Sequence, residues 1–73
     1  MKIAVHHDRQ ASGPGADRAR AAALAYLEGG KVKEVEYEGD QGPAWEVEAE
    51  RPDGKDVELL LNADYEVLLV EED

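Results

Sequence analysis

An alternation of apolar and acidic residues between Ala44 and Leu61 constrains the fold more than any other feature of the chain. Up to residue 50 apolar residues alternate with glutamates, and apolar residues again occupy every second position from 57 to 61. This period of two is typical of strands with one buried and one solvated face. Between the two runs, Pro52-Asp53-Gly54 is expected to reverse the chain, because proline presets φ for a turn and glycine accepts positive φ. The stretch therefore predicts a β-hairpin.

Two further strands are predicted beside this hairpin, one over residues 32–38 and one over residues 67–70. An isolated hairpin is marginal in water, so additional strands are needed for stability. The short connections between the four segments favour an antiparallel meander. Val32 is out of phase with Val35 in the alternation, which predicts a β-bulge or a late strand start at that point.

An alanine-rich segment from Ala16 to Glu28 has the composition of a helix. Pro14 suits a first helical turn, and Asp17 lies where the positive end of the helix dipole is expected. Gly29-Gly30 is expected to end the helix, with one glycine in the left-handed cap position. The apolar stripe that should face the sheet consists of Ala16, Ala19, Ala23, Leu24 and Leu27.

The predicted fold class is α+β, with one N-terminal helix packed on one face of an antiparallel four-stranded β-meander. Residues 16–73 are expected to form a single domain, preceded by an arm or short strand plus loop over residues 1–15. An extra short strand containing Ile3 and Val5 is an open alternative to a loose arm. Trp45 should lie under the helix, near Leu24 and Leu27. Odd-numbered strand residues should form the core, namely Val35, Tyr37, Trp45, Val47, Ala49, Val57, Leu59, Leu61, Val67 and Leu69.

The charge of the chain excludes several classes of partner. Eighteen acidic residues against eight basic residues give a formal net charge of −10 over 73 residues. Such a charge repels nucleic acid and anionic lipid, and it favours a basic protein surface or a cation. No apolar run is long enough to span a membrane. The chain has no cysteine, so disulfides, thiolate metal sites and thiol nucleophiles are excluded.

No pattern of residues predicts a catalytic, cofactor or metal site. His6-His7-Asp8 could offer metal ligands, but neighbouring histidines on a strand point to opposite faces, so a solvated arm is the preferred interpretation and the role of His6 and His7 stays open. Ser12-Gly13-Pro14-Gly15 lacks the lysine of a nucleotide-binding loop. A carboxylate face could bind calcium, although a flat sheet encircles an ion poorly and a solvated face is preferred. That face comprises Glu34, Glu36, Glu38, Glu46, Glu48, Glu50, Asp56 and Glu58.

A candidate interaction patch is predicted on the last two strands. Leu60, Leu68 and Val70 interrupt the polar pattern and are expected to point away from the helix, with Glu58 and Glu66 at the rim. Such a patch marks an interaction site on a small protein. It could bind a basic protein partner with an apolar anchor, or it could form a homodimer. In the competing interpretation, residues 1–7 fold back and cover it.

From Ala22 onward the sequence resembles a PepSY domain, the small module of propeptides of secreted thermolysin-type peptidases and of bacterial envelope proteins. The likeness rests on the segments ALAYLEGGKV, Trp45-Glu46-Val47, Pro52-Asp53-Gly54 before Lys55, and LNADYEVL from Leu61, and covers roughly residues 19–72. The family usually has a glycine in the turn into the last strand, where this chain has Tyr65-Glu66.

The resemblance implies a helix on an antiparallel sheet, no enzyme activity, and a role in binding or restraining a peptidase or another envelope protein. It also implies a location outside the cytoplasm if the chain is a trimmed domain, whereas a natural start at Met1 would imply a cytoplasmic protein. The alternative function is a self-associating structural domain with no enzyme partner.

Overall fold

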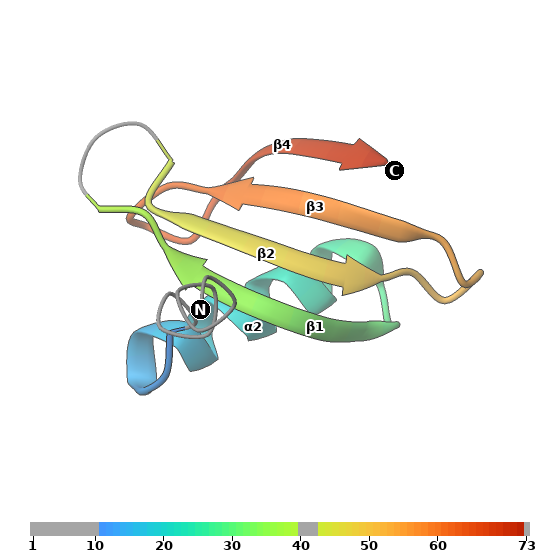
Figure 1. Cartoon of the computed structure of the whole chain (residues 1–73), viewed down its shortest axis with the longest axis horizontal. Coiled ribbons are helices and arrows are strands. Elements are labelled where there is room, and N and C mark those ends of the chain that lie inside the picture. Colours follow the sequence, from blue (N-terminus) through green and yellow to red (C-terminus); the bar gives the residue numbers. More distant parts are fainter. Residues whose placement is uncertain (1–10, 40–42, 73) are drawn as a thin grey trace, which may run out of the picture.

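The computed structural model describes residues 11–39 and 43–72 of the chain. Helix α2 (Pro14–Leu27) is followed by strands β1 (Lys31–Tyr37), β2 (Trp45–Glu50), β3 (Asp56–Leu61) and β4 (Val67–Glu72). The strands form one antiparallel sheet in the order β1-β2-β3-β4, and α2 lies on one face of it (Figure 1). The predicted fold class is confirmed. The predictions for residues 1–10, including the extra strand and the two histidines, lie outside the described residues.

The central hairpin forms as the alternation predicts. Strands β2 and β3 pair from Trp45 opposite Leu61 to Glu50 opposite Asp56. In the turn, the Gly54 N–H donates to the carbonyl of residue 51 at 2.9 Å, and the Asp53 carboxylate accepts a hydrogen bond from the Lys55 N–H at 3.0 Å. Gly54 has φ of 91°, a value that glycine adopts without steric cost.

Helix α2 begins at Pro14, where a missing N–H costs nothing, and ends at Leu27. The left-handed cap residue is Glu28, with φ of 62°, so the expectation that a glycine takes this position is wrong. Gly30 is required for a different reason. A Cβ atom at Gly30 would lie 2.1 Å from the carbonyl oxygen of Glu50, so the chain can enter β1 close to β2 only without a side chain here.

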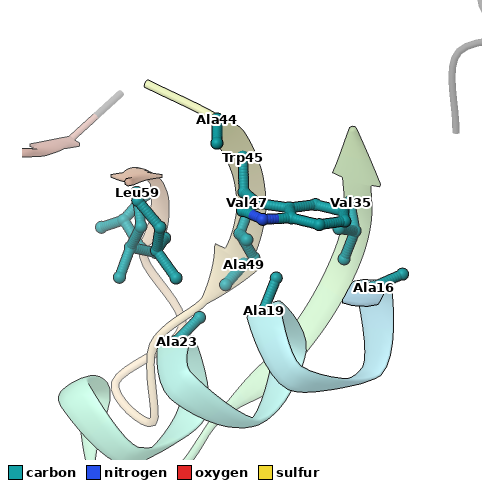
Figure 2. Close-up of a cluster of buried hydrophobic side chains, with 11 residues drawn as sticks. Ala16, Ala19, Ala23, Val35, Ala44, Trp45, Val47, Ala49 and Leu59 are labelled. Carbon is teal, nitrogen blue, oxygen red and sulfur yellow. The ribbon is translucent and has the colours of Figure 1, made fainter. Parts of the chain in front are cut away.

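The helix packs on the sheet through alanines. Ala16, Ala19 and Ala23 are fully buried, and their small side chains let the helix lie close to the strands (Figure 2). Each fully buried Val or Leu on the sheet stabilises the fold by roughly 1.5–3 kcal/mol. Leu27 packs at the margin of the core and Leu24 is half-buried. The largest fully buried side chains are Leu59, Leu61, Val35 and Val47.

Trp45 is a core residue, as predicted, with an exposed fraction of 9%. Its six-membered ring lies over the first turn of α2, because a Cβ atom at Gly15 would be 3.0 Å from two of its carbons. Leu24 lies about 13 Å further along the helix at 1.5 Å per residue, and Leu27 lies beyond it. The prediction that these two leucines lie near Trp45 is therefore wrong. The tryptophan meets the helix where glycine leaves room for it.

Two irregularities in strand pairing decide which side chains face the helix. Val32 pairs with Ala49 and Glu34 pairs with Glu48, so Lys33 is an extra residue, and the predicted bulge in β1 is confirmed. In β4 the pairing shifts in the same way around Leu68.

The bulge in β4 reverses the predicted orientation of two residues. Val70 pairs with the buried Leu59 and packs against the core, whereas Leu69 pairs with Leu60 and is 46% exposed. The predictions that Leu69 points inward and Val70 outward are therefore wrong. The alternation of β4 is read correctly only if Leu68 is removed from the count.

Tyr37 pairs with Trp45 in the sheet, and the two ring centroids are 4.9 Å apart. It lies at the end of edge strand β1 and is 51% exposed, so it borders the core that it was predicted to join. The remaining strand residues predicted to be in the core, with Leu69 excepted, are buried or pack against the core.

Candidate functional site: the outer face of the sheet

The face of the sheet opposite α2 carries a row of directly paired glutamates, which we call the glutamate row. Glu34 pairs with Glu48, Glu48 with Glu58, and Glu58 with Glu71, so one carboxylate comes from each strand. Directly opposed side chains on neighbouring strands have Cβ atoms about 5 Å apart, and like charges at that distance destabilise the pair. The sheet therefore holds this row against electrostatic repulsion.

The neighbouring row changes character across the sheet. Glu36 pairs with Glu46 on the first two strands, and Glu46 pairs with Leu60, which in turn pairs with Leu69. An apolar pair therefore lies beside an acidic pair on β3 and β4. We call Glu58, Leu60, Leu69 and Glu71 together the β3–β4 patch.

The structure brings together only part of the predicted interaction patch. Leu60 and Glu58 belong to the β3–β4 patch, and Leu68 adjoins it with an exposed fraction of 54%. Val70 is excluded, because it packs against the core. Glu66 lies in the turn before β4, where its carboxylate accepts a hydrogen bond from the Asn62 side-chain amide at 2.9 Å.

Sequence reasoning missed Leu69 and Glu71, the two β4 residues of the patch. The only signal is that β3 and β4 each contain an unbroken apolar run, from Leu59 to Leu61 and from Val67 to Val70. The run in β4 is one residue longer than the run in β3, and a β-bulge accommodates such an extra residue. The position of that bulge cannot be read from the run itself, because every residue in it is apolar.

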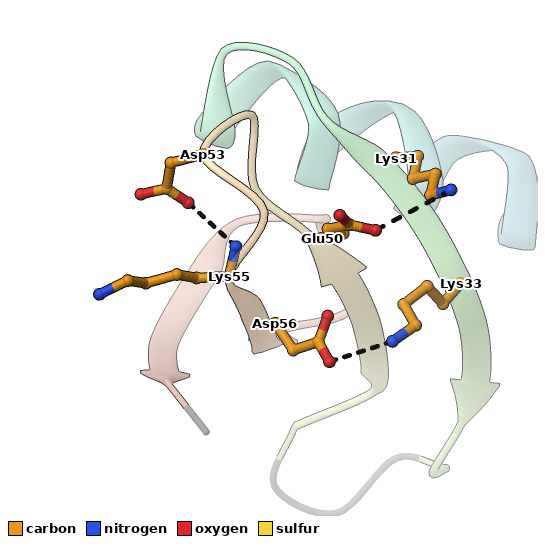
Figure 3. A network of polar contacts seen from close by, with 6 residues as sticks. All are labelled: Lys31, Lys33, Glu50, Asp53, Lys55 and Asp56. Carbon is orange, nitrogen blue, oxygen red and sulfur yellow. Dashed lines mark hydrogen bonds and ion pairs between the residues drawn. The ribbon is translucent and has the colours of Figure 1, made fainter.

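Lys33 places a cation beside the glutamate row. Its Nζ atom lies 3.1 Å from Oδ2 of Asp56 (Figure 3). The hydrogen bond and charge of Asp56, with smaller contributions from Glu50 and Glu48, raise the pKa of Lys33 above its usual value. The bulge therefore aims a lysine from β1 at an acidic side chain on β3.

The hollow beside this ion pair is too small for an organic cofactor. It measures about 60 Å³ and is lined by Lys33, Glu48, Ala49, Asp56, Val57 and Glu58. Typical small-molecule sites occupy roughly 300–1,000 Å³. This hollow is therefore too small to enclose a ligand of that size.

A second acidic group lies on the first two strands. Oxygen atoms of Glu36, Glu38 and Glu46 are within 4.8 Å of one another. Glu36 and Glu38 also interact with other groups of the chain, and Glu38 is exposed. An acidic cluster of this kind does not by itself define a metal site, so binding of a divalent cation stays an open alternative to the preferred solvated face.

Comparison with known proteins identifies the class to which this helix-on-sheet module belongs. Residues 15–64 match the PepSY family, described as the peptidase propeptide and YPEB domain. This is a propeptide-type family of generally non-catalytic domains. The match covers well over half of the chain, and the chain belongs to the PepSY family.

One solved structure is similar over most of its length. The NMR structure of the signal-sequence-deleted Rv0603 protein from Mycobacterium tuberculosis is 47% identical, with a TM-score of 0.68. The similarity covers 86% of this chain and 79% of that chain. No curated protein sequence matches the chain. Among the described residues, no helix has the length and apolar character that crossing a membrane would require.

The match to the family ends at residue 64, before β4 begins at Val67. Leu68, Leu69 and Glu71 thus lie outside the matched residues. The β3–β4 patch combines one strand of the matched part with one strand beyond it.

Proposed function

We propose that this chain is a non-catalytic protein-binding domain that engages and restrains a peptidase or another protein of the cell envelope. The observation that carries the proposal is the exposure of Leu68 and Leu69 on β4, next to Leu60 on β3. Large apolar side chains that are exposed together and rimmed by charge are typical of protein interaction sites. Truncation of such anchors commonly costs an interface more than truncation of the surrounding polar residues.

The comparisons support the kind of partner. The family description names peptidase propeptides, and Rv0603 carries a signal sequence that was deleted for its structure. We propose by analogy that this domain acts outside the cytoplasm, where secreted peptidases and envelope proteins are found. The acidic surface favours a partner with a basic surface, because complementary charge speeds association.

Photo-crosslinking in cells tests this proposal. A photoreactive amino acid is placed at Leu69 in the full chain, and cross-linked proteins are identified by mass spectrometry. The control position is Tyr26, which is 58% exposed but lies on α2, away from the outer face. We expect a peptidase or an envelope protein to cross-link from position 69 and not from position 26. A captured peptidase should then lose activity when the purified chain is added.

Identical cross-linked proteins from positions 69 and 26 would contradict a specific role of the patch. Cross-links to copies of the chain alone would favour the second candidate function, a self-associating structural domain. That candidate is supported by the position of β4 at an edge of the sheet, because edge strands can pair with another chain. Sedimentation equilibrium distinguishes the two functions, since a dimer formed through this edge should dissociate in the Leu69→Glu variant.

A further inference from the structure

We propose that the partner docks on the β3–β4 patch with a polypeptide segment that carries lysine or arginine side chains next to an apolar side chain. The inference rests on the proposed function and adds the chemistry of the partner to it. The apolar side chain would cover Leu60 and Leu69, and the cations would lie at Glu58 and Glu71.

The apolar half of the site is a pair of leucines with no cover among the described residues. Leu60 and Leu69 are direct neighbours across β3 and β4, on the face that α2 does not cover. Leu69 is 46% exposed, so nearly half of a large apolar side chain is in water. A partner side chain placed on this pair would bury apolar surface from both strands, and this burial favours binding.

The charged half of the site is a pair of carboxylates that repel each other. Glu58 and Glu71 are directly paired, and in the described part of the chain neither carboxylate has a hydrogen bond or an ion pair. Two basic side chains of the described residues are engaged elsewhere, Lys33 with Asp56 at 3.1 Å and Arg51 with Glu72. A cation supplied by a partner would contact both carboxylates and remove the repulsion between them.

The combination of the two halves selects a polypeptide. A small cation would satisfy the glutamates and leave the leucines in water. Nucleic acid and anionic membranes are repelled by a chain with a net charge of −10. A second copy of the chain would place glutamates against glutamates. A basic segment with an apolar anchor complements both halves.

A peptide titration followed by NMR tests the inference on the full chain. The probe is a short synthetic peptide in which lysine and leucine alternate. One control peptide replaces lysine with glutamate, and the other replaces leucine with glycine. We expect the lysine–leucine peptide to bind more tightly than both controls and to shift the amide signals of β3 and β4 around Leu60 and Leu69. Binding should weaken as salt is added, since exposed ion pairs are screened.

Two isosteric double variants separate the patch from the overall charge. Glu58→Gln with Glu71→Gln should weaken binding of the lysine–leucine peptide about fivefold at low salt. The control variant, Glu34→Gln with Glu48→Gln, removes the same charge from the same row on β1 and β2, where no leucine pair adjoins it. It should weaken binding by less than twofold. Leu69→Ser should weaken binding about tenfold while the chain stays folded.

Equal effects of the two glutamine variants would overturn the inference, because binding would then follow net charge alone. Absence of binding, or signal shifts confined to other surfaces, would also overturn it. The proposed function would survive either result if a protein still cross-links specifically from position 69. If cross-linking fails while the peptide binds as expected, the inference of a basic segment with an apolar anchor is supported. The proposal that the partner is a peptidase or an envelope protein is then contradicted.

Discussion

Tyr65 shows how a single residue is held in a conformation that its side chain disfavours. Its φ is 67°, in the left-handed region that favours glycine. Tyr65 lies in a turn that the Asn62 side chain organises. The side-chain oxygen of Asn62 accepts hydrogen bonds from the backbone N–H groups of residues 64 and 66. The Tyr65 ring stacks on Trp45, with centroids 6.0 Å apart and an interplanar angle of 27°. The contact offsets part of the backbone strain.

Substitutions at Tyr65 should reveal this strain. Tyr65→Ala loses the stacking contact and keeps the strained backbone, whereas Tyr65→Gly loses the contact and relieves the strain. We expect both variants to be less stable than the parent, and glycine to be about 1 kcal/mol more stable than alanine in urea unfolding. At Tyr37, the last residue of β1, the order should reverse, because glycine weakens an extended strand. Equal stability of the glycine and alanine variants at position 65 would contradict the strained conformation.

At the scale of elements, the two bulges set the orientation of β1 and β4 relative to the helix. The bulge in β4 returns Val70 to the core and leaves Leu69 outside. Bulges of this kind re-aim side chains and are common at sheet edges. The patch on the outer face exists because of this shift.

The stability of two serine variants tests the register of β4. Val70→Ser should cost about 2 kcal/mol, because it removes a side chain that packs against the core. Leu69→Ser should change the free energy of unfolding by less than about 0.5 kcal/mol, since Leu69 is 46% exposed. Chemical denaturation of the two variants side by side provides the measurement. The opposite order of stabilities would restore the register without a bulge.

The bulge in β1 makes stability depend on pH through Lys33. Its pKa in the folded chain is raised from 10.5, mainly by Asp56, so the folded state holds this proton more tightly than the unfolded state. The resulting stabilisation is fully present below the unfolded pKa and is lost as pH rises through the folded pKa. Lys33→Met should therefore flatten the decline of Tm above about pH 10. Lys55→Met is the control, and an equal flattening there would contradict a specific role of Lys33.

For the whole molecule, the formal charge of −10 on 73 residues is the dominant electrostatic property. Self-repulsion of this size opposes the compact state, and the glutamate row concentrates part of it on one face. Contact with the basic partner proposed above would remove repulsion that folding alone leaves in place.

Salt should stabilise the domain for this reason. Raising sodium chloride from about 0.02 M to about 0.5 M should increase Tm by about 4 °C, as screening weakens the repulsion more than it weakens the few exposed ion pairs. The variant Glu34→Gln with Glu48→Gln should start from a higher Tm at low salt and gain less. A Tm that falls with salt in the parent chain would show that the ion pairs outweigh the repulsion. Differential scanning calorimetry gives both values.

The sequence by itself determined the elements and most of the core. The signals are local: the alternation over residues 45–61, the Pro52-Asp53-Gly54 turn and the alanine-rich helix. Each depends on the conformational preferences of neighbouring residues and not on how the elements pack together. The bulge in β1 was also predictable, because Val32 and Val35 break the alternation visibly between charged neighbours.

Only the tertiary structure decided which residues of β4 point away from the helix and where the Trp45 ring packs. In the run Val67-Leu68-Leu69-Val70 every residue is apolar, so the hydrophobic pattern does not show which side chains face the helix. The pairing of β4 with β3 decides this, because it leaves one residue of the run without a partner on β3. Trp45 lies over Gly15 because space is open there, and that space exists only once helix and sheet have docked. The β3–β4 patch depends on cross-strand register in the same way, because a shift of one residue moves a side chain to the other face of a sheet.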